Sequence, residues 1–76
     1  MIGRVLQLIS QVGGIGPLEP DAVIYDAGFS SVRVLQLLLA LEDEFGIKIP
    51  DNDFIAARSP RAIAGLVERL REKQAA

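Results

Sequence analysis

Residues 30–50 decide the fold, and they read SSVRVLQLLLALEDEFGIKIP. Two serines come first, and serine is a preferred N-cap because its hydroxyl accepts a hydrogen bond from a free N–H of the first helical turn. The leucine-rich segment that follows ends at Gly46, a residue that commonly terminates helices. Residues 47–49 alternate apolar and polar side chains up to Pro50, which disfavours helix in the residue before it. The stretch therefore predicts a helix over 32–45 and a short extended connector.

Upstream of this stretch, apolar residues recur in steps of three and four, which predicts an amphipathic helix over 2–12. Gly13 and Gly14 end it, and Gly16, Pro17 and Pro20 prevent a restart. Residues 13–29 form a long irregular loop. Because this loop carries several apolar side chains, we expect it to lie across the core; they are Ile15, Leu18, Val23, Ile24, Tyr25 and Phe29. A short strand over 22–25 is the alternative, disfavoured because it has no partner strand.

Downstream of Pro50, Asp51 or Asn52 is expected to cap a short helix over 53–57. Ser59-Pro60 is a strong start signal for a last helix, which is expected to end near Lys73 with residues 74–76 frayed. The predicted fold is all-α: a small four-helix bundle of three main helices and one short helix, with a long loop between the first two. Residues 1–76 are expected to form one domain. The initial Met favours a free-standing protein over a domain excised from a larger synthase.

The composition excludes several function classes. The 76-residue chain is 50% hydrophobic and has no Cys and no His, so the usual general base and the usual metal ligands are missing. We expect no catalytic residue and no metal site. A net charge of −2 disfavours nucleic-acid binding, which needs clustered Lys and Arg. No apolar run approaches the roughly 20 residues that span a bilayer. A cytoplasmic monomer is expected.

The residues before the second helix carry the chemistry. Asp26-Ala27-Gly28-Phe29 leads into Ser30 and Ser31. A helix N-terminus presents free N–H groups and partial positive charge, so it favours a bound or attached phosphate. A serine at that position is a good acceptor for a phosphodiester. On this local pattern alone, helix capping is the favoured explanation for both serines.

The wider pattern resembles the attachment site of acyl and peptidyl carrier proteins over about residues 23–70. It consists of Asp-x-Gly-x-x-Ser-apolar, a leucine-rich helix, the acidic residues 42–44, Phe45 and a connector into Pro50. The resemblance implies a carrier, not an enzyme. It implies that Ser31 receives 4′-phosphopantetheine from coenzyme A through a phosphopantetheinyl transferase. An acyl- or aminoacyl-specific ligase or an acyltransferase would load the cargo. Downstream synthases would then use it. A chain without Cys must import the thiol that holds a thioester.

Two positions depart from the family pattern. Ser30 stands where the family usually has Asp, and Arg33 stands where fatty-acid carriers commonly have an acid. We therefore expect a specialised carrier, of a secondary-metabolite or aminoacyl pathway, in preference to the general fatty-acid carrier. Fatty acyl, polyketide, aminoacyl and D-alanyl cargo all remain open.

The second helix is apolar on more than one face, which indicates either full burial or an apolar surface for a partner. Val34, Leu38 and Leu41 are assigned to the core, as are Phe45 and Phe54, which also suit a cavity for cargo. The predicted partner-binding residues are Val32, Arg33, Leu35, Leu39, Glu42 and Asp43. The alternative is that the long loop covers this face with Ile24 or Phe29. The competing function is a helical protein–protein interaction domain that uses the same face without a prosthetic group.

Overall fold

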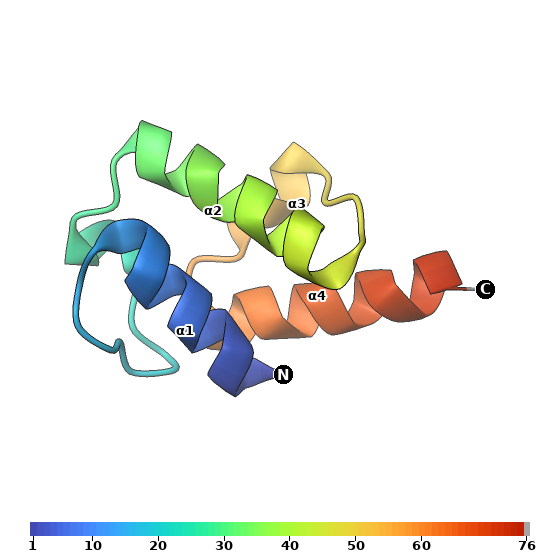
Figure 1. The fold of residues 1–76 in the computed structure, drawn as a ribbon, viewed down its shortest axis with the longest axis horizontal. Helices are drawn as coiled ribbons and strands as arrows, with labels where there is room; N and C mark the ends of the chain where they lie inside the picture. Colours follow the sequence, from blue (N-terminus) through green and yellow to red (C-terminus); the bar gives the residue numbers. More distant parts are fainter. Residues whose placement is uncertain (76) are drawn as a thin grey trace.

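The structure is a computed structural model that describes residues 1–75. Its helices are α1 (Ile2–Gly13), the 3₁₀ helix η1 (Ile24–Ala27), α2 (Ser31–Phe45), α3 (Asp51–Ala56) and α4 (Pro60–Ala75) (Figure 1). Residues 1–75 contain no strand. The prediction of a small all-α bundle with one short helix and a long first loop is confirmed, and the alternative strand over 22–25 is wrong.

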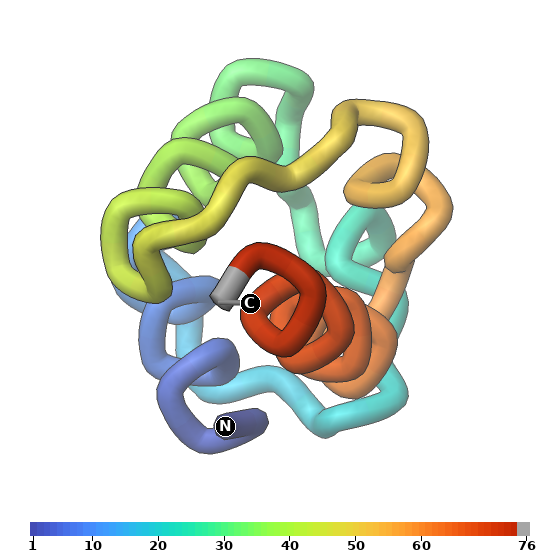
Figure 2. The backbone as a smooth tube through the Cα atoms, turned by 90° about the vertical axis from the view of Figure 1, so that its right-hand side faces the viewer, coloured from blue at the N-terminus to red at the C-terminus, as the bar shows by residue number. Residues whose placement is uncertain are grey.

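The helices enclose one hydrophobic core. Helix α1 packs against α2 and α4, and α3 packs against α4. Figure 2 looks along α4, with the other helices and the loop arranged around it. The side chains that are completely buried come from α1, η1, α2 and α4; they are Val5, Ile9, Ile24, Leu37, Leu41, Pro60, Ile63 and Val67. Phe54 of α3 is 2% exposed, so the short helix is also anchored to the core.

The long loop lies across the core, as predicted from its apolar residues. Ile24 at the start of η1 is fully buried, and Phe29 is buried close to the start of α2. Two backbone hydrogen bonds fasten this loop to the first turn of α4 and to the segment just before that helix. The Ile24 N–H donates to the Arg58 carbonyl at 2.9 Å, and the Arg61 N–H donates to the Pro20 carbonyl at 2.8 Å. The loop is thus a packed part of the fold.

Two predicted helix boundaries were wrong. Helix α3 begins at Asp51, with Pro50 as its N-cap and no side-chain capping bond, so neither Asp51 nor Asn52 is the cap. The Pro50 carbonyl accepts the Phe54 N–H at 3.0 Å, which starts the helix directly after the proline. Helix α4 continues to Ala75 instead of fraying from residue 74. The side-chain amide of Gln74 bonds both the N–H and the carbonyl of Lys48, which holds the last turn; Ala76 lies outside the described residues.

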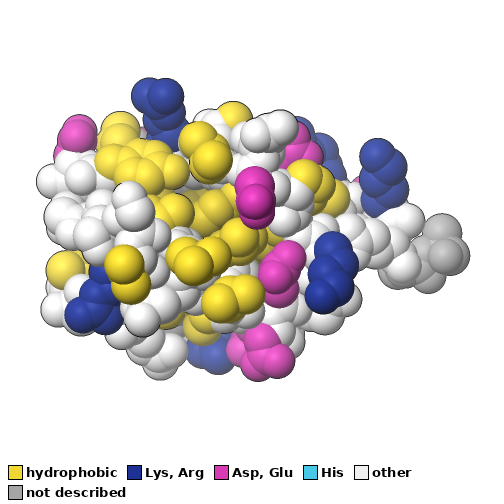
Figure 3. Space-filling view, turned by 90° about the horizontal axis from the view of Figure 1, so that it is seen from above, with side chains coloured by type: hydrophobic (Ala, Val, Ile, Leu, Met, Phe, Trp, Pro, Cys, Tyr) yellow, Lys and Arg dark blue, Asp and Glu magenta, His cyan; other side chains and the backbone are white. Residues whose placement is uncertain are grey.

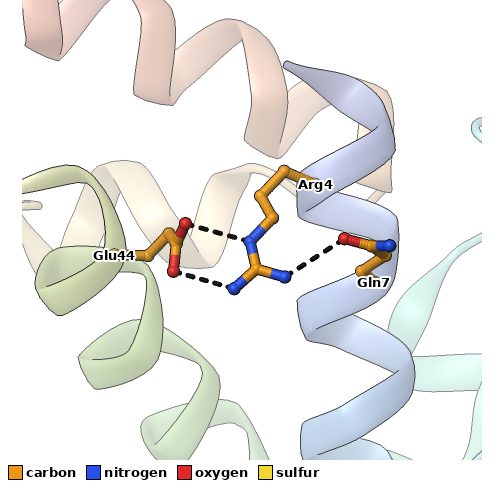
Figure 4. A network of polar contacts seen from close by, with 3 residues as sticks. All are labelled: Arg4, Gln7 and Glu44. Carbon is orange, nitrogen blue, oxygen red and sulfur yellow. Dashed lines mark hydrogen bonds and ion pairs between the residues drawn. The ribbon is translucent and has the colours of Figure 1, made fainter.

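One ion pair joins the beginning of α1 to the end of α2. Arg4 donates two hydrogen bonds of 2.9 Å to the carboxylate of Glu44 and a third, of 3.1 Å, to the Gln7 side chain (Figure 4). These hydrogen bonds to the charged carboxylate lower the pKa of Glu44 and raise the pKa of Arg4. Both side chains are partly open to solvent, so the contribution of the pair to stability is small.

Candidate functional site: Ser31 and the pocket beside it

The turn between η1 and α2 sets the position of Ser31. Gly28 ends η1 with φ at 95°, in the left-handed region that residues with a Cβ rarely adopt. The turn sends Phe29 into the core, where its ring lies against Gly13 at the end of α1. Ser31 follows two residues later as the first residue of α2.

The structure separates the two serines that the sequence pattern left equivalent. Ser30 is the N-cap of α2, and its hydroxyl accepts a long hydrogen bond of 3.4 Å from the Arg33 N–H. Ser31 is exposed, and its hydroxyl makes no hydrogen bond to any other described residue. The capping role therefore belongs to Ser30, and the hydroxyl of Ser31 is accessible to a modifying enzyme.

Arg33 makes a contact within the chain that the sequence did not indicate. Its guanidinium donates a hydrogen bond of 2.8 Å to the carbonyl of Val12, in the last turn of α1. Carbonyls in a last turn lack helical partners and carry partial negative charge, which a cation stabilises. Arg33, predicted to bind a partner, thus ties the first turn of α2 to the end of α1.

A pocket of about 650 Å³ opens beside Ser31, between α2, α3 and η1. Most of its lining is apolar or aromatic, and its charged members are Asp51 and Arg58. The lining consists of Tyr25, Phe29, Ser31, Val34, Leu35, Leu38, Asp51, Phe54, Ile55 and Arg58. Of the two phenylalanines suggested for a cavity, Phe54 lines this pocket. Phe45 does not line it; its ring is half-buried, with the Arg71 guanidinium 5.7 Å from the ring centre.

Two residues of this pocket, Ile55 and Arg58, were not singled out from the sequence. Tyr25 and Asp51 were expected in other roles, as a loop residue lying across the core and as a helix cap. For Ile55 a signal existed. Adjacent residues in a helix point about 100° apart, so in a helix as short as α3 a buried Phe54 leaves Ile55 directed outwards. Ile55 is 57% exposed. For Arg58, no feature of the sequence indicated the position, because it depends on how the chain after α3 crosses the loop.

An apolar surface surrounds the pocket on the side of α2 and α3. Its members are strongly exposed: Val32 (64%), Leu35 (55%), Leu39 (56%) and Ile55. Figure 3 views the molecule from this side and shows hydrophobic side chains gathered in a band. Ile24 and Phe29 pack inwards, so the alternative in which the loop covers this face is wrong. We call Val32, Leu35, Leu39 and Ile55 the exposed apolar face.

The remaining predicted residues of α2 divide between surface and interior. Leu38 and Leu41 are buried and Val34 is half-buried, in line with their assignment to the core. Leu37, which was not assigned, is completely buried. Asp43 is exposed. Glu42 is half-buried, and its carboxylate accepts the Ile49 N–H at 2.8 Å, so this predicted partner residue holds the connector after α2.

Residues 1–75 contain no cluster of three or more potential ligands that would hold a metal ion. None of the helices described above is long and apolar enough to cross a membrane.

Comparison with solved structures identifies the class of fold. The chain is similar to the crystal structure of an acyl carrier protein from Thermotoga maritima, with a TM-score of 0.77 and 23% sequence identity. The match covers 95% of this chain and 87% of that one. At this level of identity the likeness is one of fold, and the fold is that of an acyl carrier protein.

The family model "Phosphopantetheine attachment site" matches residues 3–67, and the chain belongs to this family. Its members are carrier proteins that bear phosphopantetheine, and they are not enzymes. Among curated proteins, the chain is 28% identical to the meromycolate extension acyl carrier protein of Mycobacterium tuberculosis over 76 residues, covering 96% of this chain. It is 26% identical to an acyl carrier protein of Rhodococcus erythropolis over 73 residues, 92% of this chain and 80% of that one. The chain spans 66% of the length of the M. tuberculosis protein.

Proposed function

We propose that this protein carries acyl groups as thioesters on a 4′-phosphopantetheine arm attached to Ser31. The observation that carries the proposal is the exposed, unbonded hydroxyl of Ser31 at the start of α2, on the edge of a largely apolar pocket. When bound, the arm supplies the thiol that the chain itself lacks. The chain's own residues present the hydroxyl, and Ser30 keeps the helix cap, so modification of Ser31 removes no bond of the fold.

The pocket favours an acyl cargo with an apolar chain. Its walls include Phe29, Leu35, Leu38 and Phe54, and burying apolar surface against such side chains is favourable by about 25 cal/mol per Å². The two relatives reported above are both acyl carrier proteins, which supports the same class of cargo. We therefore favour an acyl cargo over an aminoacyl or D-alanyl one. The work of such a carrier is proposed to take place in the cytoplasm, where coenzyme A and the loading enzymes are found.

A transferase assay tests the attachment site. The chain is incubated with coenzyme A and a phosphopantetheinyl transferase of broad specificity, and its intact mass is measured. The wild type is expected to gain the mass of one phosphopantetheine group. Ser31→Ala is expected to gain none, whereas Ser30→Ala, the matched control, retains the hydroxyl of Ser31 and is still modified. An unmodified wild type contradicts the carrier function, and modification of Ser31→Ala contradicts the site.

The exposed apolar face is proposed as the surface that docks the transferase. It adjoins Ser31, so an enzyme that reaches the hydroxyl also covers Val32, Leu35 and Leu39. Burial of these side chains by a complementary apolar surface explains why they remain exposed on a domain this small. Of the charged residues predicted to bind partners, Asp43 alone is free for this role, because Arg33 and Glu42 bond within the chain.

The same transferase assay tests the docking surface when KM and kcat are measured separately. Leu39→Asp is expected to raise the KM of the transferase for the carrier several-fold and to leave kcat unchanged, since residue 39 lies two turns from Ser31. Val23→Asp is the control, because Val23 is 39% exposed and lies outside the face. An unchanged KM for Leu39→Asp, or an equal rise for Val23→Asp, contradicts the assignment.

A further inference from the structure

Arg58 is a cation in the pocket beside Ser31 that has no partner among the described residues. Ion pairs in residues 1–75 engage Arg4 and Arg61 and leave Arg58 unpaired. Its side chain is exposed and lines the pocket together with Ser31. An arginine guanidinium presents several N–H donors in a planar fork, a geometry that suits carboxylate and phosphate oxygens. The pocket therefore offers an anion site next to the hydroxyl that we propose to be modified.

The backbone keeps Arg58 beside the segment that presents Ser31. The carbonyl of Arg58 accepts the N–H of Ile24 at 2.9 Å, and Ile24 is the first residue of η1. Helix η1 leads through the turn at Gly28 directly into α2. The positions of Arg58 and Ser31 therefore both depend on the short segment from Ile24 to the start of α2. The buried side chains of Ile24 and Phe29 fix that segment to the core.

We propose that the guanidinium of Arg58 binds the phosphate of the group attached to Ser31 and directs the arm along the pocket. This inference rests on the proposed function, because it concerns the phosphodiester formed there. A phosphodiester is anionic at all physiological pH values, and arginine bonds such oxygens through charge-assisted hydrogen bonds. Arg33, the arginine nearest to Ser31 in the sequence, is unsuited to the task because its guanidinium is bonded to the Val12 carbonyl.

Asp51 opposes this contact. Its carboxylate lines the same pocket, where it repels a phosphate and competes for the guanidinium, yet no ion pair joins it to Arg58. Removing the charge of Asp51 is therefore expected to strengthen the contact between Arg58 and the phosphate. Because Arg58 is exposed, the contact is expected to change the ratio of bound to free phosphate by a factor of about two to five, the range of solvent-exposed charge pairs. Salt is expected to weaken it.

The test uses the full chain, modified at Ser31 with coenzyme A and a transferase and verified by intact mass. The variants are Arg58→Gln, Arg58→Lys and Asp51→Asn. Arg61→Gln is the matched control, because Arg61 is also an exposed arginine but pairs with Asp21 and does not line the pocket. The readouts are the ³¹P signal of the phosphodiester during a salt titration and the side-chain Nε–H signals of Arg58 and Arg61 before and after modification.

Modification of the wild type is expected to shift the Nε–H signal of Arg58 and leave that of Arg61 in place. The titration is expected to give a bound-to-free ratio two- to fivefold lower in Arg58→Gln, an intermediate ratio in Arg58→Lys, and a higher ratio in Asp51→Asn. A ³¹P signal in Arg58→Gln that coincides with the wild type at low salt overturns the inference, as does an equal change in Arg61→Gln. Failure of the proposed function gives a different result, because the wild type then gains no phosphopantetheine mass.

Discussion

The two connections that flank α2 are both fastened to α4, and they are fastened by different means. The long loop before α2 is held by buried apolar side chains, Ile24 and Phe29, and by backbone bonds to Arg58 and Arg61. The short connector over 46–50 also buries Ile47 and Ile49, but its backbone is held by two polar side chains, Glu42 and Gln74. The loop thus depends mainly on apolar burial, and the connector depends in addition on side chains that replace missing backbone partners.

The largest expected effect comes from the apolar anchor of the loop. Ile24→Ala is expected to lower the free energy of unfolding by about 2–5 kcal/mol, because it leaves a cavity at a completely buried position. Urea denaturation measures the change. If this variant does not fold, Ile24→Val, with an expected loss of about 0.5–1.5 kcal/mol, keeps the prediction measurable. The exposed Val23→Ala is the control, and an equal loss there contradicts the role of Ile24 as the anchor.

The next effect tests the same loop from the side of α1. In Gly13→Ala, the added Cβ would lie 2.7 and 2.8 Å from two ring atoms of Phe29, closer than carbon atoms pack. The overpacking is expected to lower the free energy of unfolding by about 1–2 kcal/mol. The signal of the Phe29 ring in NMR spectra should shift. Gly3→Ala on the same helix, where the new Cβ meets open space, is expected to be neutral or stabilising.

Breaking the clamp on the connector is expected to cost less. Gln74→Ala removes two hydrogen bonds to Lys48, and the freed groups are exposed to water, so the expected loss is about 1 kcal/mol. Hydrogen exchange of the Lys48 amide should accelerate. Gln36→Ala, at an exposed position whose side chain bonds no other described residue, is the control. A loss as large as that of Ile24→Ala would remove the contrast between the two connections.

The smallest effect belongs to the ion pair that joins α1 to α2. Because Arg4 lowers the pKa of Glu44 in the folded state, the pair adds stability above the unfolded pKa of the carboxyl and loses it as the pH falls through the folded pKa. The difference in unfolding free energy between the wild type and Glu44→Gln should therefore be largest near neutral pH and shrink on acidification. Asp43→Asn is the control, because it removes the neighbouring charge, which forms no ion pair in residues 1–75, and keeps the pair of Arg4 and Glu44.

The contrast between the connections also explains how far the sequence predicted the molecule. The apolar anchors were predictable, because Ile24, Phe29, Ile47 and Ile49 stand out as apolar residues in segments that the sequence predicts to be irregular or extended. The family was predictable as a resemblance, because the pattern around Ser31 is local in sequence, and the same pattern led to Ser31 as the proposed attachment site. Polar contacts between distant segments were not predictable. Arg33 with Val12 and Gln74 with Lys48 join residues 21 and 26 positions apart, and each depends on the final arrangement of the helices.

The clamp by Gln74 has a consequence for how copies of this chain meet one another. An extended segment with free N–H groups is a template on which another chain adds a strand. Here the N–H groups of Ile47, Lys48 and Ile49 all have acceptors within the same chain: the Glu42 carbonyl, the Gln74 side chain and the Glu42 carboxylate. Residues 47–49 alternate like a strand but offer no free donor for pairing. The side-chain amide of Gln74 thus bonds the backbone of Lys48 as a neighbouring strand would in a sheet, and this disfavours self-association through strand pairing.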